Sequence, residues 1–141
     1  MDKQLLEAKL NQLLYILAET EGWLETGAEN FGADKKTVRA CQRNLQLLVE
    51  YASDINGLLV LELGQKAPGS YRESFSAVFE MPFAAKFLDS DKSVLLESVD
   101  WRNELIHEYE PKGDDQIFYE KLRQFLEAYR DYAKIVHKNF N

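Results

Sequence analysis

The sequence is poor in cysteine, proline and glycine, and each shortage narrows the choice of fold. Cys41 is the only cysteine, which excludes an intramolecular disulfide and fits a cytosolic protein. Three prolines and seven glycines in 141 residues supply few turns, whereas a fold built from many short strands needs turns at short intervals. These shortages favour long helices.

The chain also lacks an excess of positive charge and a long apolar run. Its net charge of −7 argues against a dedicated DNA-binding domain, because such domains depend on phosphate contacts. Any contact with RNA therefore has to be local and concentrated. The apolar run around GLLVL is far too short to span a bilayer, and the charged start MDKQLLEAKL is unlike a secretory signal. We expect a cytoplasmic protein without a membrane partner.

What the sequence contains instead is helical periodicity, with apolar residues recurring every three or four positions. The clearest stripes are Leu6, Leu10, Leu13, Leu14 and Leu17; then Val38, Cys41, Leu45, Leu48, Ala52, Ile55 and Leu59; and finally Phe118, Leu122, Phe125, Tyr129, Tyr132 and Val136. No strand pattern competes with them. Residues 1–141 are thus predicted to form one all-α domain, an up-and-down bundle of four long helices plus a shorter one.

Capping residues predict where several of these helices begin and end. Asp34 is suited to cap the second long helix, because its side chain can accept hydrogen bonds from the free amides of the first turn. Gly64 is expected just after the end of that helix. Beyond the turn-rich stretch GQKAPGS, Ser70 and Glu73 have the spacing of a capping box and predict the start of the shorter helix.

Proline marks helix boundaries in the second half of the chain. Pro82 breaks the shorter helix and predicts a short helical piece over residues 82–88. Either Ser90 or Asp91 is suited to cap the third long helix. That helix is expected to run until Pro111 stops it.

The third long helix has an arginine in its apolar stripe. At about 100° per residue, one line along the helix contains Leu95, Val99, Arg102, Ile106 and Tyr109. Asn103 and His107, four residues apart, lie side by side on the flank of that line. A buried arginine is costly unless it is paired. Arg102 therefore either pairs with a carboxylate, with His107 an ordinary hydrogen-bonded histidine, or it faces a cleft or a subunit interface.

The three polar side chains of this helix suit metal-free cleavage of RNA. Arg102 offers a fixed fork of donors for a phosphate, and His107 can move a proton near neutral pH. Asn103 can orient either the histidine or the phosphate. No second histidine or cysteine stands at ligand spacing from His107, so no metal site is predicted. A second proton-transferring group is needed for the leaving oxygen, and a two-fold dimer would provide one.

The motif R-N-x-x-x-H-x-Y, formed by Arg102, Asn103, His107 and Tyr109, resembles the signature of the HEPN superfamily and in particular of the HepT-like toxins. The resemblance covers nearly the whole chain, including TVRACQRNLQLLVEYASDINGLL and GSYRESF. It implies an α-helical homodimer with one composite ribonuclease site. Arg102 and His107 would be its catalytic residues, and Asn103 would support them.

The same resemblance implies a protein partner. HepT-like toxins pair with a minimal nucleotidyltransferase antitoxin, which can transfer AMP from ATP to the motif tyrosine, here Tyr109. The added bulk and negative phosphate would obstruct an RNA-binding pocket. ATP would belong to the partner's chemistry, so we expect this chain to carry no cofactor of its own.

Two interpretations stay open at the level of sequence. Lys36, Arg39 and Arg43 form a basic stripe, which is either the solvated face of a helix or a contact surface for RNA or the antitoxin. The whole chain is either the ribonuclease toxin or a non-catalytic helical module that binds a nucleotidyltransferase. The intact motif favours the toxin, and the acidic net charge favours the module.

Overall fold

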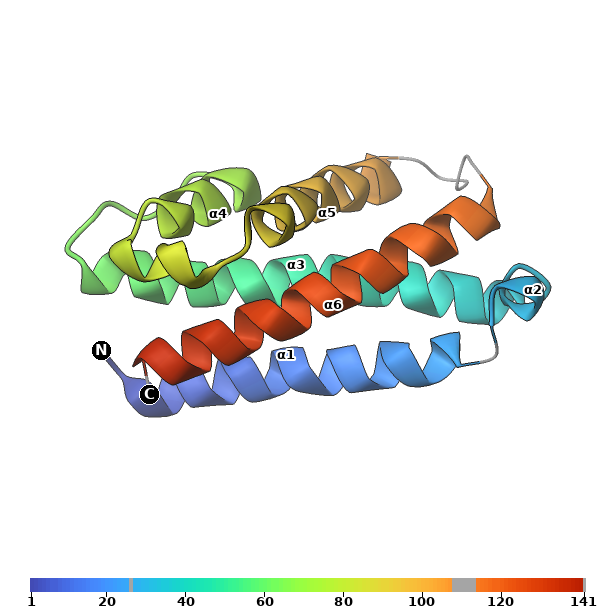
Figure 1. Ribbon diagram of the computed structural model, residues 1–141, viewed down its shortest axis with the longest axis horizontal. Coiled ribbons are helices and arrows are strands. Elements are labelled where there is room, and N and C mark those ends of the chain that lie inside the picture. Colours follow the sequence, from blue (N-terminus) through green and yellow to red (C-terminus); the bar gives the residue numbers. More distant parts are fainter. Residues whose placement is uncertain (26, 108–113, 141) are drawn as a thin grey trace.

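The computed structural model describes residues 1–25, 27–107 and 114–140, and it is a helical bundle (Figure 1). Its elements in order are α1 (Lys3–Leu24), α2 (Ala28–Phe31), α3 (Lys35–Glu62), α4 (Tyr71–Phe79), the 3₁₀ helix η1 (Pro82–Lys86), α5 (Asp89–His107) and α6 (Asp115–Phe140). The predicted all-α bundle is confirmed, with α1, α3, α5 and α6 as the long helices. None of the helices in these ranges is both long and apolar enough to cross a lipid bilayer.

Three helix termini lie where the capping residues predict them. The Asp34 carboxylate accepts hydrogen bonds from two amides in the first turn of α3, and Gly64 follows α3 with a φ of 72°, a conformation that favours glycine. Ser70 Oγ accepts a hydrogen bond from the Glu73 amide at the start of α4. The Glu73 carboxylate accepts one from the Gly69 amide, so the capping box closes one residue earlier than the S-x-x-E pattern predicts.

The segment between α1 and α3 contains a helical turn, α2 (Ala28–Phe31), which none of the apolar stripes in the sequence indicates. Its buried Phe31 explains the turn. The Phe31 ring packs against the rings of Phe118 and Tyr119 at the start of α6, with centroid distances of 6.1 and 5.4 Å. This long-range contact anchors a stretch whose local sequence has no helical periodicity.

Two predicted boundaries near η1 were wrong. The helix α5 begins at Asp89, and the Lys92 amide already donates to the Leu88 carbonyl, so Ser90 and Asp91 lie in the first turn and neither is the N-cap. The short piece after Pro82 is a 3₁₀ helix that ends at Lys86. The predicted end of α5 before Pro111 lies outside the described residues.

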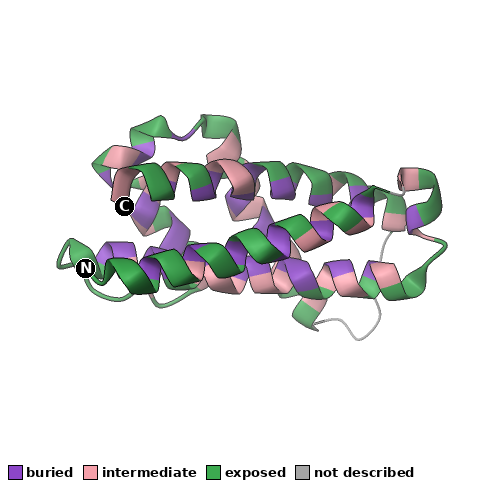
Figure 2. Cartoon of the chain, turned by 90° about the horizontal axis from the view of Figure 1, so that it is seen from below, coloured by how far each residue is buried: buried purple, intermediate pink, exposed green. Residues whose placement is uncertain are grey.

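The core lies between α3 and the helices around it. The helix α3 contacts α1, α4, α5 and α6, and the buried residues lie on the helix sides that face one another (Figure 2). Tyr129 and Tyr132 are fully buried, and their hydroxyls bond to Ser98 and Asn56. Burial also raises the pKa of the Cys41 thiol to about 12, which makes it a poor nucleophile.

A carboxyl pair joins α5 to α6 and makes stability dependent on pH. Partial burial, and then the hydrogen bond and charge of Asp131, raise the pKa of Asp91 to about 6. Because the pKa is higher in the folded state than in the unfolded chain, the contribution to stability is full below about pH 4 and is lost as the pH rises through 6. We therefore expect Asp91→Asn to raise the free energy of unfolding at pH 7.5, by on the order of 1 kcal/mol after solvent screening.

Urea denaturation at pH 5 and pH 7.5 measures this effect. The Asn variant should lose less stability between the two pH values than the unsubstituted protein does. Asp89→Asn, an exposed carboxylate of the same turn, is the matched control and should leave the pH dependence unchanged. An Asp91→Asn protein with the original pH dependence would show that Asp91 does not titrate in this range.

Candidate active site

Arg102 lies where the apolar stripe of α5 passes from the core to the surface. Leu95 and Val99, on the same line, are buried, whereas Ile106 is 43% exposed. The Arg102 side chain is 17% exposed and lies between these two environments. The structure thus answers why an arginine occupies a packing stripe: at this level of the bundle the stripe faces a cleft.

Residues from α3 and α4 surround the Arg102 guanidinium. Its Cζ lies 4.5 Å from the centroid of the Tyr71 ring, which covers one face. Glu50 Oε1 is 4.0 Å from Nη2, too far for a hydrogen bond. Nη1 donates to Asn103 Oδ1 at 3.0 Å. The guanidinium is therefore oriented by three neighbours, but its donors are not used up by a bidentate carboxylate.

Within the described part of the chain, one donor of Arg102 is left without a partner. Among the described residues, Nε is buried and has no hydrogen-bond acceptor. An unsatisfied buried donor costs about 1–3 kcal/mol. An arginine whose charge is only partly compensated by a carboxylate, and whose donors are not all hydrogen-bonded, contributes little to stability. Such a side chain is suited to bind an anion.

The cleft in front of Arg102 has a volume of about 580 Å³. Its lining comes from α3, the connection that precedes α4, the start of α4, and α5: Ser53, Pro68, Gly69, Ser70, Tyr71, Arg72, Val99, Arg102 and Asn103. Arg72 on its rim pairs with Asp100 at 3.1 Å, and both side chains are more than half exposed. The cleft thus contains two arginines and several hydroxyl groups, which is a composition suited to a phosphate-bearing ligand.

A hydrogen-bond network fixes the floor of this cleft to the core. Ser53 Oγ donates to Ser74 Oγ at 3.1 Å, and Asn56 Nδ2 donates to the same oxygen at 3.2 Å. The Tyr132 hydroxyl in turn donates to Asn56 Oδ1. The network ties α3 to α4 and α6, so it holds the helices that carry Glu50 and Tyr71 in a fixed relation.

Sequence reasoning missed Glu50, Tyr71 and Ser53 as members of the site. The long helix α3 has many polar residues, and nothing in the sequence distinguishes Glu50 and Ser53 from the others. Only the packing of α5 against α3 brings these two residues to Arg102. Tyr71 is the first residue of α4 after its Ser70 cap. The predicted Ser70 cap places Tyr71 in the first turn of the helix, but no local sequence pattern predicts that an arginine from another helix stacks on its ring.

The rest of the motif lies at the edge of the described structure. His107 is the last residue of α5, and its side chain falls outside the described residues, as does Tyr109. Asn103 and His107 share a face of α5 because they are four residues apart. Since Arg102 donates to Asn103, its guanidinium is directed toward the face that His107 shares.

Comparison with known protein families identifies the chain. The family model described as ribonuclease HepT-like matches residues 13–136. The chain belongs to the HepT-like ribonuclease family. No functionally curated protein matches its sequence significantly.

Solved structures share the fold of this HepT-like chain. One belongs to a crystal structure of a toxin–antitoxin with AMP-PNP; it is 16% identical with a TM-score of 0.81, and the match covers 96% of this chain and 99% of the other. Another is YutE from Bacillus subtilis, a cytosolic protein of unknown function; it is 18% identical with a TM-score of 0.74, and the match covers 98% and 90%. At these identities the likeness concerns the fold.

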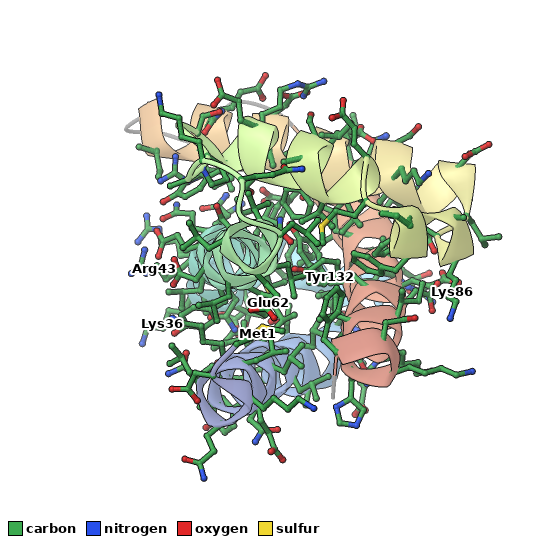
Figure 3. The ribbon with its side chains drawn as sticks, turned by 90° about the vertical axis from the view of Figure 1, so that its left-hand side faces the viewer. Met1, Lys36, Arg43, Glu62, Lys86 and Tyr132 are labelled. Carbon is green, nitrogen blue, oxygen red and sulfur yellow. The ribbon has the colours of Figure 1, made fainter. Side chains whose placement is uncertain are left out.

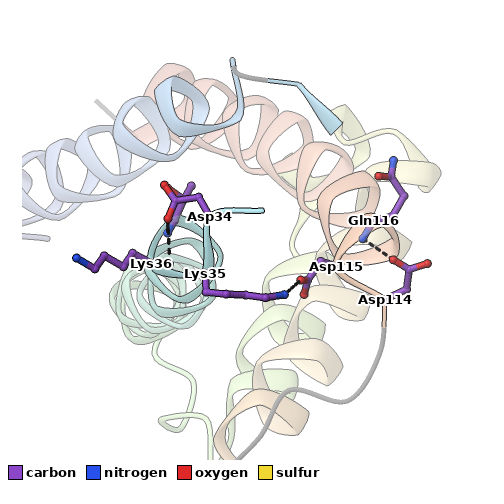
Figure 4. A network of polar contacts seen from close by, with 7 residues as sticks. Asp34, Lys35, Lys36, Asp114, Asp115 and Gln116 are labelled. Carbon is purple, nitrogen blue, oxygen red and sulfur yellow. Dashed lines mark hydrogen bonds and ion pairs between the residues drawn. The ribbon is translucent and has the colours of Figure 1, made fainter. Parts of the chain in front are cut away.

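The basic residues Lys36, Arg39 and Arg43 of the HepT-like chain lie on α3 and outside the lining of the cleft. All three are exposed, and Lys36 and Arg43 point away from the bundle on the same side of α3 (Figure 3). Their neighbour Lys35 reaches Asp115 on α6 instead (Figure 4). The stripe is thus a surface of its own, separate from the structural ion pair beside it.

Proposed function

We propose that this protein is a metal-independent endoribonuclease and the toxin of a two-component toxin–antitoxin system, acting on RNA in the cytoplasm. The observation that carries the proposal is the arrangement of Arg102. It is oriented by Tyr71, Glu50 and Asn103 over a cleft, and one of its donors has no acceptor among the residues that the structure describes. Membership of the HepT-like ribonuclease family supports the same reaction.

The proposed reaction is an internal transfer of the phosphate. His107 takes the proton of the ribose 2′-hydroxyl, whose oxygen bonds to the adjacent phosphorus. Arg102 stabilises the negative charge that develops on the phosphoryl oxygens, and Asn103 supports its orientation. The bond from phosphorus to the 5′-oxygen breaks, and a second acid protonates that oxygen. The products are a 2′,3′-cyclic phosphate and a free 5′-hydroxyl.

The second acid is proposed to come from a homodimer. One chain has a single histidine in the motif, and the other histidine of the sequence, His137, lies near the C-terminus of α6. A two-fold axis that brings two α5 helices together supplies a base from one copy and an acid, His107 of the partner subunit, from the other. The exposed Ile106 next to His107 fits burial in such an interface.

The proposed protein partner is a nucleotidyltransferase antitoxin that transfers AMP from ATP to Tyr109. A structurally similar chain comes from a crystal structure of a toxin–antitoxin with AMP-PNP, which supports a nucleotide-linked antitoxin. AMP on Tyr109 would place a bulky anion two residues from His107 and would repel the RNA backbone.

Tyr109→Phe is expected to keep full ribonuclease activity and to escape modification. Removal of the phenol oxygen removes the acceptor but leaves Arg102 and His107 in place. The measurement is intact mass after incubation with the antitoxin and ATP, with Tyr71→Phe as the control variant that retains Tyr109. A Tyr109→Phe protein that still gains the mass of AMP would place the acceptor elsewhere.

The experiment that tests the ribonuclease is incubation of the purified protein with end-labelled RNA in the presence of EDTA. We expect cleavage, fragments that end in a 2′,3′-cyclic phosphate, and a dimer by light scattering. Activity that requires an added divalent cation would contradict the proposed chemistry. Stable binding of a nucleotidyltransferase by a protein that cleaves no RNA would instead favour the non-catalytic module, which the acidic net charge also suits.

A further inference from the structure

The first half of α3 has an unusual distribution of charge. Residues 35–49 contain four cations and no carboxylate, in a chain with 24 acidic and 17 basic residues. One of the four, Lys35, is bound to Asp115. The other three, Lys36, Arg39 and Arg43, form the basic stripe. They concentrate positive charge on one short surface of an acidic protein.

The side chains of the basic stripe are available to a ligand. Among the described residues, no ion pair involves any of them, and the Arg43 guanidinium donates to the neutral Gln46 at 3.2 Å. Other basic residues of the bundle are paired across helices, for example Arg130 with Glu21 and Lys121 with Glu97. Within the residues that the structure describes, no salt bridge thus consumes the charge of the stripe.

The basic stripe is also in an unfavourable position for the stability of α3. The N-terminus of a helix has a partial positive charge, and cations in its first turns are repelled. Lys36 lies in the first turn of α3, Arg39 begins the second, and the first turn has no acidic residue. Local helix energetics therefore do not explain the stripe, and the Asp34 carboxylate at the N-cap offsets only the positive charge next to Lys36.

The basic stripe lies in line with the candidate active site. At 3.6 residues per turn, Lys36, Arg39, Arg43 and Glu50 fall within an arc of about 60° on α3. Glu50 is the residue that faces Arg102. A rise of 1.5 Å per residue places Arg43 about 10 Å and Lys36 about 21 Å from Glu50 along the helix. One face of α3 thus runs from the cleft to the stripe.

The direction of α5 strengthens this connection. The helices α3 and α5 are antiparallel (Figure 1), so α5 proceeds from Arg102 toward the N-terminal half of α3. His107 is about 7.5 Å beyond Arg102 along its helix axis, next to the level of Arg43 on α3. If an RNA strand has its reacting phosphate at Arg102 and its ribose near His107, the nucleotides that continue in this direction pass over the basic stripe.

We infer that the basic stripe is a binding track for the phosphates of single-stranded RNA, beside the site of cleavage. The inference rests on the proposed ribonuclease function. Lys36, Arg39 and Arg43 each contact one phosphate on the same side of the scissile bond. Because phosphate contacts are independent of sequence, the track strengthens binding of any RNA strand without selecting bases. It accounts for RNA binding by a protein whose net charge opposes it.

The test measures binding of a short fluorescent single-stranded RNA of mixed sequence to protein carrying His107→Ala, which prevents cleavage. The test variant adds Ala at positions 36, 39 and 43, and a second variant has Gln there, which keeps the side-chain length. The control adds Lys3→Ala, Lys134→Ala and Lys138→Ala, three exposed lysines at the opposite end of the bundle. Stripe and control variants therefore carry the same net charge. Circular dichroism and thermal midpoints establish that each variant is folded.

The stripe variants are expected to bind RNA at least tenfold more weakly than the control at about 0.1 M salt. Single-stranded nucleic acids lose about 0.7 in the slope of log affinity against log salt for each phosphate contact, so three contacts should lower the slope by about 2. Affinity and slope equal to those of the control would overturn the track. So would stripe variants that bind RNA normally and instead lose the nucleotidyltransferase, since the surface would then be a protein dock.

Cleavage by protein with His107 intact separates the track from the proposed function. If the stripe variants have a raised half-saturating RNA concentration and an unchanged maximal rate, both stand. If they cleave dilute RNA as fast as the control, the ribonuclease stands and the track falls. If the unsubstituted protein cleaves no RNA, and the stripe variants nevertheless bind RNA more weakly than the control, the track stands and the proposed function falls.

Discussion

Replacing His107 by alanine is expected to lower RNA cleavage in EDTA by at least about 100-fold, and by up to about 10⁴-fold if the histidine acts in both proton transfers. In a two-fold dimer the substitution removes both the base that activates the 2′-hydroxyl and the acid that protonates the leaving oxygen. The helical circular-dichroism spectrum should be unchanged, because alanine has the highest helix propensity of the amino acids. Single-turnover cleavage of end-labelled RNA measures the loss.

The sequence offers a matched control in its only other histidine, His137. It lies in the last turn of α6, where a positive charge complements the helix terminus. His137→Ala should keep the cleavage rate within about threefold of the unsubstituted protein. If His107→Ala cleaves as fast as His137→Ala, the base is a different residue and the proposed mechanism is wrong.

The fold was predictable because its determinants are local. The stripe from Val38 to Leu59 is buried, as its three–four spacing predicts, and Asp34, Gly64 and Ser70 lie at the predicted helix termini. The differences arise where contacts between residues far apart in the sequence determine the local structure. Ring packing of Phe31 against α6 creates α2.

The candidate site was predictable only along α5. Arg102 and Asn103 could be placed together because neighbours on one helix have a fixed geometry. In the structure, Arg102 Nη1 donates to Asn103 Oδ1. Glu50 and Tyr71 are 52 and 31 residues before Arg102 in the chain, and they meet it only through the packing of α3, α4 and α5. No periodicity within a single helix contains that information. The roles of Arg102, His107 and Tyr109 in RNA chemistry remain predictions.

Arg102 gives the second large effect, because activity and stability should change in opposite directions. Arg102→Lys keeps the charge but loses the planar fork and the stacked face against Tyr71. Loss of a group that stabilises developing charge typically lowers the rate by about 10²–10³-fold. We expect a loss of this size with lysine as well as with methionine. Recovery of the original rate by lysine would mean that only the charge matters.

Arg102→Met is expected to raise the free energy of unfolding by on the order of 1 kcal/mol. The substitution removes a buried donor that has no partner among the described residues, and a charge whose printed ion-pair partner in that part of the chain, Glu50, is 4.0 Å away. Glu50 stays partly exposed and solvated, so its loss of a partner costs little. Urea denaturation measures the change.

Arg123→Met serves as the matched control for both measurements. Arg123 also lies over a tyrosine ring, at 5.9 Å from Tyr119, but on α6 and outside the cleft. It should change neither the cleavage rate nor the stability appreciably. An Arg102→Met protein that is inactive because it is destabilised by several kcal/mol would make Arg102 a structural residue. An inactive protein that is more stable would mean that the bundle keeps this arginine at the expense of its own stability, which is the behaviour of a residue retained for a ligand.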